Sequence, residues 1–297
     1  MSEKLNHCPV CLNANSNHFL EVKDHFQSGE DFQIRECLQC GFRYIDPRPE
    51  TERIGGYYQS DDYISHGAQH NDLLSILYRI ARRFTIRRKY SQIVGRLKPD
   101  CLLDYGCGTG DFLKYCQDKG IEVRGVEPNE KAREYARNIQ RLTVFSSLQE
   151  AENEGKRFSC ITLWHVLEHI HDLEVTLQKI IGLLAPGGML VIAVPNCLSG
   201  DARKYGARWA AYDVPRHLYH FNPTTLELLM KRFGFEVMAT QPQILDAYYI
   251  SLLSEKYRTG KSRYLAAFFS GMMSNFQARN KGWGHSSMVF FLSVKKP

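Results

Sequence analysis

The chain has 297 residues, of which 43% are apolar, a share typical of a folded protein with a buried core. Lysine and arginine number 38 against 32 acidic residues, and the resulting net charge of +6 permits an anionic partner without requiring one. No apolar run reaches the roughly 18 residues of a membrane span, and Met1–His7 lacks an apolar secretory core. We therefore expect a cytoplasmic protein without a membrane span, although association with a membrane surface stays open.

The N-terminal segment carries two Cys-x-x-Cys pairs, Cys8 with Cys11 and Cys37 with Cys40. Four thiolates arranged in two such pairs suit a tetrahedral zinc ion. Because protein ligands fill all four positions, this zinc would be structural rather than catalytic. With a hairpin expected from residues 19–23 and 32–36, the pattern predicts a zinc ribbon over residues 1–48. An iron site or a reduced, metal-free ribbon is the alternative.

The other five cysteines lie within apolar segments of the chain. We interpret them as small core residues, because free cysteine packs as a small hydrophobe; they are Cys101, Cys107, Cys116, Cys160 and Cys197. A chain without an export signal is not expected to depend on disulfides.

A basic helix is predicted over residues 71–97, where apolar side chains recur at helical spacing from Leu73 to Leu97. Its other face carries most of the excess positive charge: Arg79, Arg82, Arg83, Arg87, Arg88, Lys89 and Arg96. This face could dock an anionic substrate, RNA or a membrane surface. We favour the simpler interpretation of a solvated helix face.

A glycine-rich turn follows the strand-like run that ends at Asp104. Gly106, Gly108 and Gly110 occupy alternate positions, where bare backbone allows a tight turn and close approach of a ligand. A dinucleotide-binding fingerprint would space its glycines differently. About 20 residues on, Glu127 ends a second strand, where an acid can accept hydrogen bonds from ribose hydroxyls.

Further segments continue the alternation of strands and helices that implies a doubly wound, mostly parallel sheet. A strand over 158–164 runs into a polar turn, and a Pro-Gly-Gly turn at 186–188 precedes another buried strand. Helices are expected near 110–119, 129–139, 148–155, 172–184 and 223–233. Residues 243–285 interrupt the final hairpin with two predicted helices, which are candidates for a lid, a dimer surface or a lipid-facing patch.

Four ordered motifs across residues 100–197 resemble those of the class I S-adenosylmethionine (SAM) methyltransferases. The resemblance implies a seven-stranded Rossmann-like sheet over residues 71–297, preceded by the ribbon and by a linker over 49–70. It implies that the glycine turn wraps the amino-acid end of SAM and that Glu127 holds its ribose. The cofactor-binding residues it implies are Asp104, Gly106, Cys107, Gly108, Gly110, Glu127, Leu148, Trp164 and His165.

The linker is similar to that of bacterial methyltransferases with an N-terminal cysteine ribbon. This similarity implies that Tyr57, Tyr58 and Tyr63 close over the cofactor or the substrate. A tyrosine-rich clamp that holds the ribbon to the core is an equal alternative.

A loop at 209–221 concentrates polar and aromatic side chains after the fifth predicted strand. A base with a pKa near the working pH would assist transfer to oxygen or nitrogen, and histidine fits. Our candidates are His217 first, then His220 and His165, with Tyr212 and Asp213 orienting the acceptor or the base.

The sequence thus predicts a SAM-dependent methyltransferase acting on a small molecule, such as a sugar, a polysaccharide precursor or a lipid-linked metabolite. Residues 164–167 lack the Asp/Asn-Pro-Pro-aromatic motif of nucleic-acid amino methyltransferases. An RNA methyltransferase that grips RNA through the ribbon and basic helix is less favoured, as is a SAM-binding protein without activity. The sequence does not fix the acceptor atom or the oligomeric state.

Overall fold

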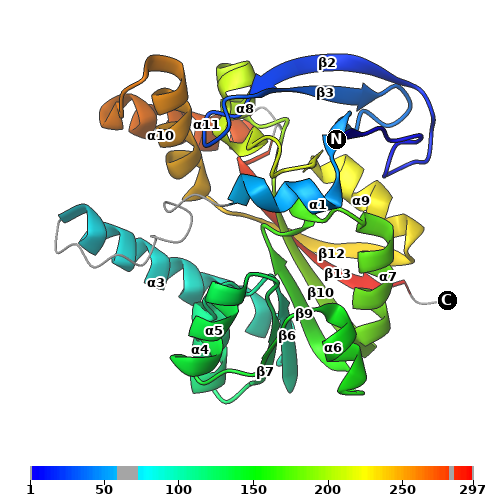
Figure 1. Cartoon of the computed structure of the whole chain (residues 1–297). Coiled ribbons are helices and arrows are strands. Elements are labelled where there is room, and N and C mark those ends of the chain that lie inside the picture. The colour runs from blue at the N-terminus through cyan, green and yellow to red at the C-terminus, as the bar shows by residue number, and fades with distance from the viewer. Residues whose placement is uncertain (1, 59–72, 281–283, 296–297) are drawn as a thin grey trace. The chain divides into compact units, whose positions relative to one another are not determined.

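The computed structural model describes residues 2–58, 73–280 and 284–295. Its residues form two compact units. The first unit comprises residues 1–59, 165–174 and 192–297, and the second comprises residues 60–164 and 175–191. Figure 1 labels the elements of both units.

The first unit contains the predicted N-terminal hairpin, β2 (Ser16–Lys23) and β3 (Asp31–Cys37). Together with β4 (Arg43–Ile45) and β11 (Tyr219–His220), these strands form a four-stranded sheet in the order β11-β4-β3-β2. All neighbours in this sheet are antiparallel. The ribbon strands therefore share one sheet with a strand from the histidine-rich loop. A separate pair joins β1 (Ser2–Glu3) to β5 (Arg48–Pro49).

A short helical segment follows the ribbon, with α1 (Thr51–Ile54) and a 3-10 turn at Gly55–Tyr58. Tyr63, predicted to close over a ligand, lies outside the described residues. The predicted basic helix is α3 (Leu73–Val94) in the second unit.

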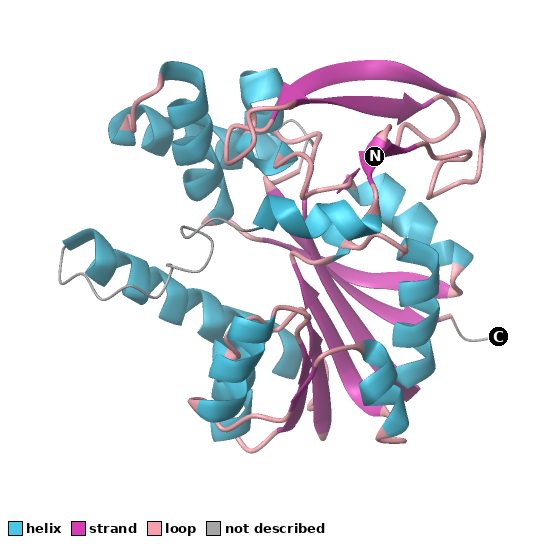
Figure 2. Ribbon diagram, viewed as in Figure 1, coloured by secondary structure: helices cyan, strands magenta, loops and turns pink. Residues whose placement is uncertain are grey.

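A seven-stranded sheet has the order β12-β13-β10-β9-β6-β7-β8. Its strands, magenta in Figure 2, are β6 (Cys101–Tyr105), β7 (Glu122–Val126), β8 (Val144–Phe145), β9 (Phe158–Trp164), β10 (Leu184–Pro195), β12 (Phe235–Pro242) and β13 (Ser287–Val294). The pairs β6–β7, β6–β9 and β7–β8 are parallel, whereas β12–β13 is antiparallel. The expected doubly wound, mostly parallel sheet is confirmed.

The strand order reverses at β6, because the chain goes from β6 to β7 on one side and later to β9 on the other. In open α/β sheets, ligands bind at the carboxyl ends of the strands beside such a switch point. The glycine-rich turn therefore begins where the topology predicts a ligand.

The five predicted helices of the core are present, each close to its expected bounds. They are α4 (Asp111–Asp118), α5 (Glu130–Asn138), α6 (Leu148–Asn153), α7 (Leu173–Leu183) and α9 (Pro223–Arg232). Local sequence explains several of their starts. Asn129 and Ser147 cap α5 and α6, and Asn222 forms a capping box with Thr225 ahead of α9.

The loop after β10 contains α8 (Gly200–Tyr205) and two 3-10 turns, Gly206–Arg208 and Ala210–Tyr212. The insert before the last strand forms α10 (Asp246–Thr259) and α11 (Tyr264–Asn280), as predicted. In the part of the chain that the structure describes, no helix is long and apolar enough to cross a membrane.

Candidate functional site

The glycine turn between β6 and α4 is built from backbone that only glycine adopts readily. Gly106, Gly108 and Gly110 have φ values of 74°, 55° and 81°. At Gly110 a Cβ atom would also lie 2.5 Å from Cδ1 of Leu142, so the turn is tightly packed as well as left-handed. The amides of Gly106 and Cys107 donate to the Val126 carbonyl, which fixes the turn to the end of β7.

Glu127 closes this turn from the end of β7. One oxygen of its carboxylate accepts a hydrogen bond from the Gly108 amide at 2.8 Å, and the other accepts from the Asn129 amide at 2.8 Å. Burial raises the pKa of Glu127, whereas these amide bonds oppose the rise. Each carboxylate oxygen keeps a further lone pair, so the side chain can still accept from a ligand's hydroxyls.

Asp104 lies at the end of β6, almost fully buried. Its Oδ1 accepts a hydrogen bond from the Thr162 hydroxyl at 2.5 Å. Burial raises the pKa of Asp104 to about 7, although the hydrogen bond from Thr162 opposes the rise. A carboxyl group in this state can be neutral or charged near physiological pH, according to what binds beside it.

The remaining predicted cofactor residues of the second unit lie at a strand end, at a helix start and behind the turn. Trp164 ends β9, with the Phe112 ring edge-on at 5.7 Å and the Lys89 ammonium 4.6 Å from its ring centre. Leu148 is buried at the start of α6. The sulfur of Cys107 lies 2.6 Å from where a Cβ on Gly125 would be, so it packs behind the turn.

His165, in the first unit, follows β9 directly and has a φ of 57°, unusual for a side chain of its size. Its Nδ1 lies 3.5 Å from a carboxylate oxygen of Glu168, and its Nε2 lies 3.2 Å from one of Asp246. Burial would lower the pKa of His165, but these two carboxylates raise it to about 9. As an imidazolium it would be a poor general base, although it could donate hydrogen bonds.

The three residues Glu168, His169 and His217, which we call the loop cluster, place their ligand-type atoms within 4.8 Å of one another. The two imidazole rings meet edge to face, 4.5 Å between centres. Glu168 is completely buried, and its carboxylate accepts no hydrogen bond from any described residue. Burial lowers the pKa of His169 to about 4, with a further contribution from His217.

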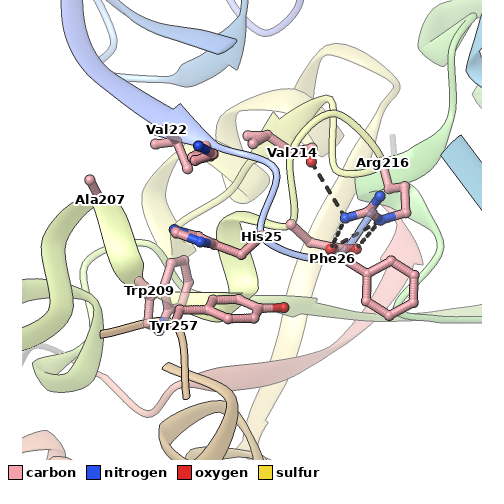
Figure 3. Close-up of a pocket in the computed structure, with 10 residues that line it drawn as sticks. Val22, His25, Phe26, Ala207, Trp209, Val214, Arg216 and Tyr257 are labelled. Atoms are coloured by element: carbon pink, nitrogen blue, oxygen red, sulfur yellow. Dashed lines mark hydrogen bonds and ion pairs between the residues drawn. The ribbon is translucent and has the colours of Figure 1, made fainter. Parts of the chain in front are cut away.

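Arg216 holds the loop that carries His217. Its guanidinium pairs with Asp24 at 2.9 Å and with Asp213 at 2.7 Å, and its side chain is almost fully buried. Burial opposes the charge on Asp24, but Arg216 lowers the pKa of Asp24 to about 2. Figure 3 shows the Arg216 guanidinium beside the Phe26 ring, within a small pocket that His25 and Tyr257 also line. Asp24 directly follows β2, so its ion pair with Arg216 fixes the loop to the end of that strand.

Two predicted catalytic residues lie in the core of the first unit. Tyr212 is 2% exposed and His220 is 3% exposed, and their rings contact each other edge to face at 5.0 Å. Burial lowers the pKa of His220 well below its usual value. Neither side chain has the exposure that contact with a small molecule requires.

The four ribbon cysteines converge as predicted. Their sulfur atoms lie within 4.8 Å of one another, with Cys8 3.6 Å from Cys40 and Cys11 3.5 Å from Cys37. Four sulfurs around a zinc ion at about 2.3 Å would be roughly 3.8 Å apart, so this donor set fits the ion.

Sequence reasoning did not assign roles to Glu168, His169, Asp24 or Asp246. A signal existed for two of them, because Glu168 and His169 lie just after the buried strand β9, at whose carboxyl end ligands gather. Asp24 and Asp246 gave no such signal, since their partners are 192 and 81 residues away along the chain.

Comparison with known proteins was informative for the central part of the chain. A protein family described as "Methyltransferase domain" matches residues 78–240, more than half of the chain. This match spans the glycine turn, Glu127 and the loop cluster.

Curated relatives match a shorter segment. A ubiquinone biosynthesis O-methyltransferase of Coxiella burnetii (strain Dugway 5J108-111) is 31% identical over 117 residues, which cover 37% of this chain and 50% of that protein. One from Rhizobium etli is 24% identical over 148 residues, covering 46% and 60%. The chain thus spans about half the length of the curated relatives it matches.

Solved structures share the fold. The cyclopropane synthase MmaA2 from Mycobacterium tuberculosis has a TM-score of 0.53 at 15% identity, covering 82% of this chain and 98% of that one. Magnesium protoporphyrin IX methyltransferase from Synechocystis PCC 6803, solved with SAH, has a TM-score of 0.50 at 15% identity, covering 81% and 97%. At these identities the likeness concerns the fold alone.

Proposed function

We propose that this chain, which belongs to the family of methyltransferase domains matched over residues 78–240, transfers a methyl group from SAM to an oxygen of a small-molecule acceptor. The observation that carries the proposal is the glycine turn at the switch point of the sheet, closed by Glu127. Family membership and the named activity of the curated relatives support it.

In this proposal the second unit binds the cofactor. Glycine backbone at 106–110 receives the amino-acid end of SAM, and Glu127 accepts hydrogen bonds from the ribose hydroxyls. The sulfonium supplies the reactivity, so the protein has to align the acceptor and manage its proton. We assign that second task to the loop cluster of the first unit, where His217 is our first candidate.

The surface of α11 favours a lipid-linked acceptor over a free sugar. Its small side chains face inward, whereas large apolar side chains are exposed: Tyr264, Leu265, Phe268, Phe269, Met272, Met273 and Phe276. Exposed Lys256, Lys261 and Arg263 lie at the turn between α10 and α11. An apolar face bordered by basic residues is the pattern by which a helix lies on an anionic membrane.

A product assay tests the activity. We expect S-adenosylhomocysteine and an acceptor heavier by one methyl group when the protein meets SAM and hydroxylated aromatic acceptors with an isoprenoid tail. Mass spectrometry of both products is the measurement. Failure with all hydroxylated acceptors, together with turnover of RNA, would instead support the alternative of an RNA methyltransferase.

Sedimentation with anionic vesicles tests the choice of a lipid-linked acceptor. Replacing Phe268 and Phe269 by serine should release the protein from the vesicles. A matched control is Ile139→Ser, because Ile139 is 64% exposed at the end of α5, away from α11 in the chain. Equal sedimentation of both variants would argue against the α11 face as the binding surface.

We also propose that the ribbon cysteines hold one structural zinc ion. Their converging sulfurs support this assignment. Elemental analysis of the purified protein should find one zinc per chain at the ribbon, and Cys8→Ser should lose it.

A further inference from the structure

We propose that the loop cluster, Glu168, His169 and His217, is a binding site for one divalent transition-metal cation. The site is distinct from the cysteine ribbon and uses only nitrogen and oxygen ligands. The existence of the site follows from the geometry below, whereas its task in catalysis rests on the proposed function.

The separation of the ligand atoms suits a single ion. They lie within 4.8 Å of one another. An ion about 2.0–2.2 Å from each imidazole nitrogen and carboxylate oxygen requires separations of roughly 3.0–3.5 Å. Movement of each ligand atom by up to about 1 Å toward the centre would close the site.

The hydrogen bonds of both histidines indicate which ring nitrogen carries the proton; Nε2 of His217 also lies 3.9 Å from a carboxylate oxygen of Asp213. Nδ1 of His217 lies 2.9 Å from the Ala211 carbonyl oxygen, and Nδ1 of His169 lies 3.0 Å from the Arg216 carbonyl oxygen. A carbonyl oxygen can only accept, so each Nδ1 carries the proton and each neutral ring keeps its lone pair on Nε2. Metal-binding histidines are held in this way, with the second nitrogen donating to a carbonyl or carboxylate.

Glu168 supplies an independent observation. It is 0% exposed, and neither carboxylate oxygen accepts a hydrogen bond within the described part of the chain. An ionised carboxylate without such partners is costly to bury. His165 is the nearest charged group, with its Nδ1 3.5 Å from Glu168 and its Nε2 3.2 Å from Asp246, but it donates no hydrogen bond to the Glu168 carboxylate. A divalent cation would satisfy the carboxylate and both lone pairs together.

The ligand types restrict the ion. Two imidazoles and one carboxylate suit manganese, iron, cobalt or zinc, whereas magnesium and calcium prefer oxygen alone. Three protein ligands leave coordination positions open, as in catalytic rather than structural sites.

The open positions indicate the substrate class, an acceptor whose hydroxyl oxygen can bind the cation. A cation held by these residues would lower the pKa of that hydroxyl, whose proton would leave to solvent. The acceptor oxygen could then take the methyl group of SAM, with the carbon–sulfur bond breaking and its electrons remaining on sulfur. In this arrangement His217 is a metal ligand and not a general base. The cation, rather than His217, would promote ionisation of the acceptor hydroxyl.

Manganese binding to the whole protein tests the site, because Mn²⁺ favours oxygen and nitrogen ligands over the ribbon thiolates. After mild chelation that leaves the ribbon metal in place, titration followed by electron paramagnetic resonance should show one Mn²⁺ bound per chain. Glu168→Gln and His217→Gln should each weaken binding by about tenfold or more. The control His171→Asn removes a neighbouring histidine that contacts Pro49 and Thr51 instead, and should bind as the wild type does.

The outcomes separate this inference from the proposed function. If the wild type binds no Mn²⁺ and elemental analysis finds no ion beyond the ribbon metal, the site does not exist. Unchanged affinity in folded Glu168→Gln and His217→Gln would also overturn it. Methyl transfer that proceeds equally without the cation would remove its catalytic task and leave the proposed function standing. Cation binding without methylation of any acceptor would uphold the site and defeat the proposed function.

Discussion

The glycine turn and the loop cluster are built on opposite principles. The turn uses contiguous backbone and one carboxylate, Glu127, whose partners lie within 19 residues. The loop cluster joins side chains from residues 168–169 and 217, and a buried ion pair to Asp24 anchors it. We therefore expect the glycine turn to be sensitive to added side-chain volume. The loop cluster should instead be sensitive to the loss of a charged partner.

The largest expected effect tests that anchor. Arg216→Met would leave the buried Asp24 without its cation, so we expect a loss of about 3–5 kcal/mol in the free energy of unfolding. The exposed pair of Lys114 with Asp118 is the control, since Lys114→Met should cost less than about 1 kcal/mol. Denaturant unfolding measures both, and equal losses would show that the loop does not depend on this charge.

Asp104 should make stability depend on pH in the protein without cofactor. Burial raises its pKa to about 7, so between about pH 4 and pH 7 the folded state holds a proton that the unfolded state releases. The contribution of Asp104 to the free energy of unfolding is therefore complete below about pH 4. It is lost as the pH rises to 7, by up to about 1.4 kcal/mol per pH unit. Asp104→Asn should flatten this slope, whereas the exposed Asp100→Asn should leave it. A slope that persists in Asp104→Asn would assign the dependence to another group.

Two glycines separate packing from backbone strain in the second unit. Gly110→Ala should cost about 2–4 kcal/mol, because the left-handed backbone adds to a close contact with Leu142. Gly120 has a φ of 85°, but a Cβ atom added there would meet open space. Gly120→Ala should therefore lower the free energy of unfolding by only about 1–2 kcal/mol. Thermal unfolding compares them. If Gly120→Ala were the worse variant, the turn at Gly110 would not be tightly packed.

The smallest expected effect concerns the basic helix. Arg82 pairs with Asp111 and contacts Thr109, and Lys89 lies over Trp164, so part of the predicted basic face is engaged within the second unit. We expect Arg83→Gln with Arg87→Gln to leave small-molecule methylation unchanged. Filter binding of RNA at low and high salt is the check. If RNA affinity of the wild type falls steeply with salt, and the double variant loses this dependence, the RNA alternative would be supported.

The same contrast explains what the sequence could predict. Periodicity and glycine spacing located the strands, helices and turn, because each depends on neighbours along the chain. Periodicity also located the two-helix insert, and the spacing of the two Cys-x-x-Cys pairs located the ribbon. Periodicity did not reveal that His220 and Tyr212 are core residues, since a polar residue type looks alike whether buried or exposed. The pairing of Asp24 with Arg216 depends on tertiary packing, which no local pattern encodes.

Calorimetric titration of SAM into the wild-type protein and Glu127→Gln tests the central claim most directly. We predict one SAM per chain for the wild type and an affinity lower by about 10- to 100-fold for the variant, because a charged acceptor of hydrogen bonds is lost. Absence of SAM binding to the wild type, or equal affinity in Glu127→Gln, would contradict the assignment of this turn as the cofactor site.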